Sequence, residues 1–398
     1  MTGVGATWRR AFACPLAAPA LLALLLTACT GTAPLPPELA GSPAPTPGPR
    51  TSTVAPVPVP SGAARPRLTA QRRIPLRGLP RVVGVRLLGT RVLFAACADC
   101  SRPDDAGALY VHDLAAGRTR RVAVTAFRHG VVLPLGGAGD VVAWADVAPV
   151  PLALASRTQW RLVVLDLATG RSRVLAGTDP AERSVPPWTA AGDSLVAWQD
   201  RAGDGLSGPV HVADLRTWQV REVPGGAPAP LAGLTADALL YVGGPPAGAP
   251  GGGAAGPAAT ADVYALPLAG GAPRALSSTH DVGGVATDGV TAVWTSPQGE
   301  SSTVWAAPLG SGAPRPVYSG PTANAVPGDG FVAVMTADEP VLAVAPLAGG
   351  PAVTVPDVPD PRAGLASDGP RLAWVAAPDR GVDADGHHPL VLVVAEVR

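Results

Sequence analysis

The chain has 398 residues and a formal net charge of zero, only 15% of its residues are charged, and its cationic side chains are Arg, with no Lys. A neutral chain without a basic cluster argues against a nucleic-acid partner. The 48 Gly and 47 Pro, with Val and Asp among short apolar runs, favour an all-β fold over a helical one.

The first 28 residues have the organisation of an export signal rather than of a folded element. Arg9 and Arg10 precede the apolar stretch Ala11–Leu26. The tetrapeptide Leu26-Thr27-Ala28-Cys29 resembles the lipobox of bacterial lipoproteins. This resemblance implies cleavage before Cys29, a lipid on Cys29, and anchoring to the extracytoplasmic face of the cell membrane. The alternative is an ordinary secretory signal, or an uncleaved anchor, followed by a chance cysteine.

Residues 29–67 are expected to form an extracytoplasmic linker. The stretch is rich in Pro, Ala, Ser and Thr and cannot form a packed core, which predicts a semi-extended spacer. Residues 68–398 then form the folded domain.

One pattern returns seven times in this domain, at intervals of about 40–50 residues, which is typical of propeller blades. In each repeat a Gly- or Asp-containing turn precedes an apolar strand that ends in a large residue. A third strand follows, and in all but the last repeat a tight turn comes next. The large residues are predicted to pack between blades; they are Phe94, Trp144, Trp198, Tyr241, Trp294, Met335 and Trp374.

The seventh repeat stops after its third strand, at Arg398. Gln71–Leu76 is similar to the fourth strands of the other repeats, so it can complete the last blade. We therefore predict an all-β, seven-bladed propeller of four-stranded blades, closed by an N-terminal strand, and we expect it to be a monomer. Six or eight blades stay open because the first-strand signals are weak.

The stretch Asp166-Leu167-Ala168-Thr169-Gly170 and its siblings resemble the repeats of TolB-like and WD40-like bacterial propellers. That resemblance implies a role in protein interaction or ligand docking. A similar motif occurs in quinoprotein propellers, but their docking Trp is missing here, where Arg173 and Val174 stand in its region. We therefore expect no cofactor.

Cys97 and Cys100 are predicted to form a local disulfide, because disulfides are the usual state of paired cysteines outside the cytoplasm. A redox-active pair would favour a helix N-terminus, whereas these residues follow a strand. A zinc site would need further ligands, and the chain has no second Cys-x-x-Cys.

The segment Asp379–His388 is the richest polar cluster of the chain. Asp383 and Asp385 could bind Ca²⁺, and His387 and His388 a transition metal, although no glutamate closes an EF-hand loop. A solvated loop without metal is the plainer interpretation, and we expect no metal site.

Gly192-Asp193-Ser194-Leu195 matches the short signature of GDSL hydrolases, with Asp385 and His388 as matching partners. However, the tetrapeptide occupies the turn position of its repeat, and the other segments have no helical pattern. Ser194 is therefore not predicted to be catalytic.

The functional prediction is a lipid-anchored propeller that docks a protein or glycan partner of the cell envelope. Its interaction surface is expected on the face that carries the variable connections between second and third strands, such as Val147–Thr158. The alternatives are a lactonase- or lyase-like hydrolase with a metal in the channel, and a purely structural domain. The first-strand segments carry few metal ligands, His129 being the exception.

Overall fold

The computed structural model describes a large part of the second of the two units into which the chain divides, Met1–Ala55 and Pro56–Arg398. The described residues are 65–79, 81–97, 107–128, 130–148, 158–178, 187–192, 194–200, 208–224, 230–243, 261–279, 281–298, 301–310, 312–336, 341–355, 359, 363–377 and 390–398. Cys29 and the predicted signal segment lie outside these ranges. Within them every regular element is a strand, and no helix has the length and apolarity to cross a membrane.

The strands form seven four-stranded antiparallel sheets, or blades. Blades 1 and 2 are β2(Arg81–Leu88), β3(Arg91–Cys97), β4(Ala108–Asp113), β5(Arg118–Val124) and β6(Val131–Ala138), β7(Val141–Val147), β8(Trp160–Asp166), β9(Ser172–Gly177). Blades 3 and 4 are β10(Trp188–Gly192), β11(Leu195–Gln199), β12(Val210–Asp214), β13(Val220–Glu222) and β14(Leu231–Leu234), β15(Ala238–Gly243), β16(Asp262–Pro267), β17(Arg274–Ala275). Blades 5 and 6 are β18(Val285–Thr287), β19(Thr291–Gln298), β20(Ser301–Pro308), β21(Arg315–Gly320) and β22(Asn324–Gly328), β23(Phe331–Met335), β24(Leu342–Pro346), β25(Val353–Val355). Blade 7 is β26(Leu365–Asp368), β27(Arg371–Ala376), β28(Val391–Val397) and β1(Leu68–Pro75).

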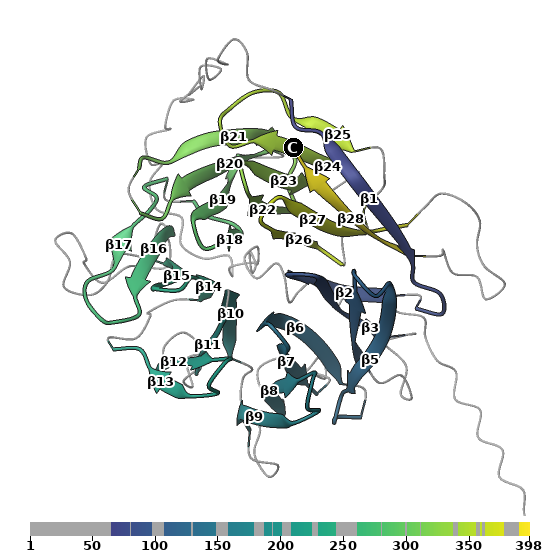
Figure 1. Cartoon of the computed structure of the whole chain (residues 1–398). Coiled ribbons are helices and arrows are strands. Elements are labelled where there is room, and N and C mark those ends of the chain that lie inside the picture. Colours follow the sequence, from purple (N-terminus) through teal and green to yellow (C-terminus); the bar gives the residue numbers. More distant parts are fainter. Residues whose placement is uncertain are drawn as a thin grey trace, which may run out of the picture. The chain divides into compact units, whose positions relative to one another are not determined.

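The blades form a closed ring, with the first strand of each blade innermost (Figure 1). Each innermost strand contacts the innermost strand of the next blade, from β2 through β6, β10, β14, β18 and β22 to β26, and β26 contacts β2 again. The predicted fold, a seven-bladed β-propeller, is confirmed.

The ring is closed by β1, which pairs antiparallel with β28 and completes blade 7 (Figure 1). The pairing runs from Leu68 opposite Val397 to Pro75 opposite Val391. Next to it, the backbone amides of Arg67 and Arg398 donate to each other's carbonyl oxygens at 2.8 and 2.9 Å. The predicted closure by an N-terminal strand is therefore confirmed.

An Asp-Leu pair begins the turn between third and fourth strands in blades 1 to 3. The Asp166 carboxylate accepts hydrogen bonds from the backbone amides of Ala168 and Thr169, at 2.9 and 3.1 Å. Asp113 and Asp214 cap their turns in the same way. Gly170 follows at a φ of 72°, a left-handed conformation that glycine adopts without a Cβ clash. Hydrogen bonds from the side chain and backbone of Thr169 lower the pKa of Asp166.

The large residue near the end of each second strand is buried, as the sequence predicts. The exposed fraction is at most 4% for all seven of these side chains, Phe94, Trp144, Trp198, Tyr241, Trp294, Met335 and Trp374. Trp374 of blade 7 belongs to one apolar cluster with Phe331 and Val344 of blade 6. These side chains therefore fill the space between sheets that pack face to face.

Arginines on the fourth strands link neighbouring blades. Arg120, for example, donates from Nη2 to the carbonyl oxygen of Leu167 in the next blade, at 3.4 Å. We call the five residues that make such a bond the clasp arginines: Arg72, Arg120, Arg173, Arg221 and Arg274. Arg72 on β1 bonds to the Leu114 carbonyl of blade 1, so the closing strand carries the same link as ordinary fourth strands.

The series of clasp arginines stops after blade 4. Arg315 of blade 5 pairs with Ala306 as Arg274 pairs with Ala265, but it makes no such bond among the described residues. Val353 has the corresponding place in blade 6, opposite Val344. The clasp is therefore complete only at the blade boundaries from 7–1 to 4–5.

Tyr241 provides a test of this core at alkaline pH. Burial, with a smaller effect of Tyr264, raises the pKa of Tyr241 to about 12. Since the folded pKa is raised above the unfolded value of about 10, the contribution of neutral Tyr241 is complete below pH 10 and is lost as pH rises toward 12. We expect Tyr241→Phe to remove the last step of a tyrosinate absorbance titration and to reduce the alkaline loss of stability.

At neutral pH the same variant should melt like wild type, because the Tyr241 hydroxyl has no hydrogen-bond partner among the described residues. An unchanged alkaline unfolding profile in Tyr241→Phe would contradict this assignment.

Candidate functional site

The two faces of the ring differ in the length of their connections. In each antiparallel blade, the first–second and third–fourth connections lie at one end of the strands, and the second–third connection lies at the other. We call these the turn face and the link face. Leu88 and Arg91 are separated by a two-residue turn, whereas the links comprise residues 98–107, 148–159, 200–209, 244–261, 299–300, 336–341 and 377–390. Except in blades 5 and 6, the link of a blade is longer than its turns taken together, so chain length is concentrated on the link face.

Buried polar side chains also gather at the link face, where strands adjoin the links and the blade-to-blade connections. Those of the described residues are Asp146, Thr158, Gln199, Asp262, Ser277, Ser296, Thr303 and Thr336. His112 and Thr235 are the buried polar side chains found toward the turn face. A buried polar group needs hydrogen-bond partners, so this distribution indicates ordered bases for the links.

Asp146 is the most completely buried of these groups, with an exposed fraction of 0%. Its carboxylate accepts hydrogen bonds from Arg161 Nε and from the Ala126 amide, each at 2.9 Å, and from the Thr125 hydroxyl. The Arg161 guanidinium also lies 5.9 Å from the Phe127 ring centroid. Because Asp146 and Arg161 precede and follow link 148–159, they hold its two ends to the connection between blades 1 and 2.

Blade 3 has a corresponding polar base. His211 Nε2 lies 3.1 Å from Asp200 Oδ2, and the imidazole ring stacks on Trp198 with centroids 5.3 Å apart. These residues flank link 200–209, so the pair holds the ends of that link together.

Blade 4 orders its link through a buried serine. The Ser277 hydroxyl donates to Asp262 Oδ1 at 2.7 Å and accepts the Val263 amide at 2.9 Å. Together with blades 2 and 3, this arrangement places rigid supports under three successive links.

Cys97 ends β3 and is disulfide-bonded. Its predicted partner Cys100 lies outside the described residues, so that pairing stays a prediction. The same holds for the metal candidates Asp383, Asp385, His387 and His388. In the part of the chain that the structure describes, no three His, Cys, Asp or Glu side chains are placed to hold a metal ion.

Ser194 lies in the turn between β10 and β11, on the turn face. Its carbonyl oxygen accepts the Leu215 amide at 2.8 Å, which joins that turn to the start of the next one. Asp385 and His388 lie outside the described residues. Ser194 therefore lies in a turn, as the sequence predicted for the GDSL-like tetrapeptide.

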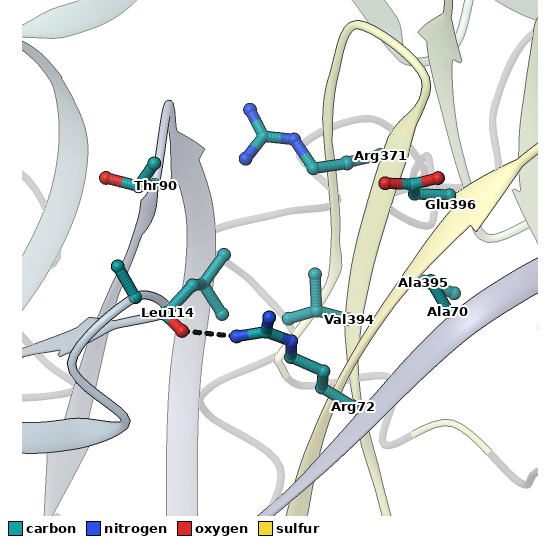
Figure 2. A pocket seen from close by; sticks show the side chains of 9 residues that line it. Ala70, Arg72, Thr90, Leu114, Arg371, Val394, Ala395 and Glu396 are labelled. Atoms are coloured by element: carbon teal, nitrogen blue, oxygen red, sulfur yellow. Dashed lines mark hydrogen bonds between the residues drawn. The ribbon is translucent and has the colours of Figure 1, made fainter.

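Figure 2 shows a pocket of about 250 Å³ where blade 7 meets blade 1, on the turn face. Arg72 donates to the Leu114 carbonyl across it. Arg371 donates to the Gly89 carbonyl and, at 3.0 Å, to Asp368 Oδ2. Both arginines of the pocket thus form hydrogen bonds that join blade 7 to blade 1. We therefore interpret the pocket as part of the ring closure rather than as a ligand site.

Arg86 is a charged residue that the sequence interpretation missed. It lies on β2, the innermost strand of blade 1 (Figure 1). Its Nε donates to the Leu135 carbonyl of blade 2 at 3.2 Å, and Nη1 donates to the Val85 carbonyl at 2.9 Å. The sequence signal was a single Arg within Val82–Leu88, a run that otherwise consists of Val, Gly and Leu.

No protein-family model matches the sequence, and no curated protein matches it. Among solved structures, the chain is similar to the β-propeller domain of the Trilobed protease from Pyrococcus furiosus, at 11% identity and a TM-score of 0.52, covering 79% of this chain and 93% of that chain. That domain has an open velcro topology, whereas β1 and β28 close the ring here.

The chain is also similar to acylaminoacyl peptidase from Pyrococcus horikoshii, at 11% identity and a TM-score of 0.51, covering 80% of this chain and 51% of that one. It thus spans about half the length of that peptidase. TolB from Acinetobacter baumannii matches at 13% identity over 81% of this chain and 67% of its own, with a lower TM-score of 0.41. At these identities the similarity is one of fold, and the chain shares the β-propeller fold of the Pyrococcus furiosus domain.

Proposed function

We propose that this protein is a lipid-anchored docking module that binds a protein or glycan of the cell envelope on its link face. The observation that carries the proposal is the asymmetry of the ring, with short turns on one face and long links on the other. Variable connections on a rigid scaffold are where binding residues usually lie. The polar bases at Asp146, His211 and Asp262 support the same face by fixing the ends of its links.

The direction in which the chain enters the ring also supports this proposal. Leu68 begins β1 opposite Val397, at the turn-face end of β28. A tether that connects Cys29 to Leu68 therefore joins the propeller on the turn face. The link face lies at the opposite end of the strands from this entry point.

Site-specific photo-crosslinking in intact cells tests the docking face. A photoreactive residue would replace Leu152 or Ala254 in two links, and Ala115 or Ala168 in two turns as matched controls. We expect adducts from the link positions and not from the turn positions. Adducts that a glycosidase degrades would identify a glycan, and protease-sensitive adducts a protein. Equal adducts from both faces, or from the turns alone, would contradict the assignment.

The anchor is tested separately by Cys29→Ala, with Cys14→Ala as the matched control. The acyl chains of a lipoprotein contribute about 0.8 kcal/mol per buried CH₂, so their loss should release the protein from the membrane fraction. Labelling with a lipid analogue should disappear in Cys29→Ala only. Membrane retention of that variant would show that the lipobox assignment is wrong.

A further inference from the structure

Arg86 has an unusual environment for a charged side chain. It lies on the innermost strand, which borders the axis of the ring, and its side chain is exposed to solvent. Burial by surrounding protein nevertheless lowers the pKa of its guanidinium. Solvent exposure and a lowered pKa are together expected for a side chain that faces the central channel of a propeller, because the channel contains water but is enclosed by protein.

The guanidinium is held in place but only partly used. Its two hydrogen bonds, to the carbonyl oxygens of Leu135 and Val85, orient the group between blades 1 and 2. They engage Nε and one N–H of Nη1. The remaining N–H donors, on Nη1 and Nη2, have no partner among the described residues. An arginine cannot lose its charge at physiological pH, so these donors stay available to an acceptor.

The other blades place small side chains at the corresponding position. Arg86 pairs with Leu93 on the second strand of its blade, and Gly136 pairs with Ala143 at the same place in blade 2. By the same strand register, the equivalent residues in blades 2 to 7 are Gly136, Ala190, Gly233, Ala286, Val326 and Ala366. The equivalent residues are all neutral, and Gly136, Ala190, Gly233 and Ala366 are buried, so Arg86 is the one charged side chain at this register position.

No carboxylate in the described part of the chain forms an ion pair with Arg86. Acidic groups at the turn ends of the two neighbouring blades are engaged elsewhere: Asp368 accepts from Arg371 and from the Gly89 amide, and Asp140 pairs with Arg91. A cation enclosed by protein is stabilised by an anion that replaces its lost hydration. A bound anionic ligand would supply the negative charge that Arg86 lacks.

We propose that Arg86 anchors an anion site in the channel, and that its ligand is a carboxylate monoanion. A single guanidinium matches one negative charge, and its planar donors fit the two oxygens of a carboxylate. The Gly, Ala and Val residues at the equivalent positions of the other blades have no side-chain donors, and a phosphate dianion would need more donors than Arg86 alone supplies. The carboxylate could belong to a small free acid or to the C-terminus of a peptide. This site does not depend on the proposed docking function.

The test is titration calorimetry on the purified full chain with propionate, with Gly-Gly-Ala, and with the neutral counterparts propionamide and amidated Gly-Gly-Ala. We expect at least one carboxylate to bind, the neutral counterparts not to bind, and inorganic phosphate to bind at least tenfold more weakly. Tighter binding of Gly-Gly-Ala than of propionate would indicate that the ligand is a peptide C-terminus. Tighter binding of propionate would indicate a small free acid.

Arg86→Ala and Arg86→Gln should each weaken carboxylate binding at least tenfold. Arg86→Ala is expected to fold, since Ala or Gly already stands at this position in most blades. Arg315→Gln is the matched control, an exposed arginine on a fourth strand, and should bind like wild type. Binding that is unchanged in Arg86→Ala, or no carboxylate binding by wild type, would overturn the proposal.

Discussion

Deletion of Gln71–Leu76 is expected to abolish cooperative unfolding of the native ring or to lower its Tm by far more than any single surface substitution. The deletion removes the pairing of β1 with β28 from Arg72 to Pro75 and the buried Leu76. It also removes the clasp from Arg72 to Leu114. The deleted segment contributes the apolar side chains of Ile74 and Leu76 and the charge-assisted hydrogen bond of Arg72. Together these represent about 5 kcal/mol of unfolding free energy, which is comparable with the whole stability of many domains.

A second consequence of the deletion is an open β-sheet edge. Without β1, the backbone of β28 loses one of its two antiparallel partners and becomes the edge of the sheet, and unpaired edges promote association between chains. We expect concentration-dependent aggregation, measured by light scattering alongside the thermal melt. A monomer that melts at the wild-type temperature would contradict the role of β1 as the closing strand.

Two arginine variants distinguish the contribution of the clasp hydrogen bond from that of the paired β1 strand. Arg72→Ala leaves the strand in place and should cost about 1–2 kcal/mol in the free energy of unfolding. Arg315→Ala removes an arginine from the same register position where no clasp bond forms, and should change stability by less than about 0.5 kcal/mol. Equal effects of the two variants would show that the clasp bond does not contribute.

Trp374→Ala is expected to destabilise the propeller by about 3–5 kcal/mol, because it leaves a large cavity in a buried site. Trp374 is fully buried between Phe331 of blade 6 and Val393 of its own blade. For a domain of this size, the change corresponds to a fall in Tm of roughly 6–15 °C. Denaturant unfolding, followed by circular dichroism, measures the free energy directly.

The controls for this prediction are a conservative and an exposed substitution. Trp374→Phe keeps most of the apolar volume and loses an indole N–H that has no partner among the described residues, so it should cost less than half as much. Val290→Ala shortens a side chain that is 71% exposed and should leave the Tm unchanged. A Trp374→Ala protein as stable as Val290→Ala would refute the packing role of Trp374.

The fold could be predicted because its signals are local and repeated. Asp113, Asp166 and Asp214 mark turns through their own hydrogen bonds to nearby amides, which a sequence pattern displays directly. The second strands are continuous apolar runs because they are covered on both sides by neighbouring blades. Closure was also predictable, since Gln71–Leu76 is similar to the other fourth strands and has an arginine where all of them except that of blade 6 have one.

Arg86 could not be found in the same way. The innermost strands are short and irregular, and β2 changes register between Val82 and Val85. Its equivalence to Gly136 and Ala190 is therefore visible only from strand pairing. An arginine in an apolar strand also has the sequence appearance of an ordinary surface residue, because a linear pattern does not distinguish a channel from the outside.

The link face could be predicted only in outline. The lengths of the links follow from the spacing of the strands, but side chains such as Thr125 and Asp146 meet across a blade boundary that no local pattern encodes. The residues that would contact a partner lie largely in links outside the described ranges. The sequence could therefore indicate the face but not the recognition chemistry.

The interrupted series of clasp arginines implies that the blade boundaries do not resist opening equally. Between described residues, no hydrogen bond crosses from the strands of blade 5 to those of blade 6, where Val293 and Val304 pack on Val332 and Val334. Boundaries 7–1 and 1–2, by contrast, carry several, such as those from Arg72 and Arg91. Apolar contacts alone tolerate small sliding movements better than directional bonds do. Transient breathing of the ring should therefore start at boundary 5–6, and amide hydrogens there should exchange before those around the closing strand.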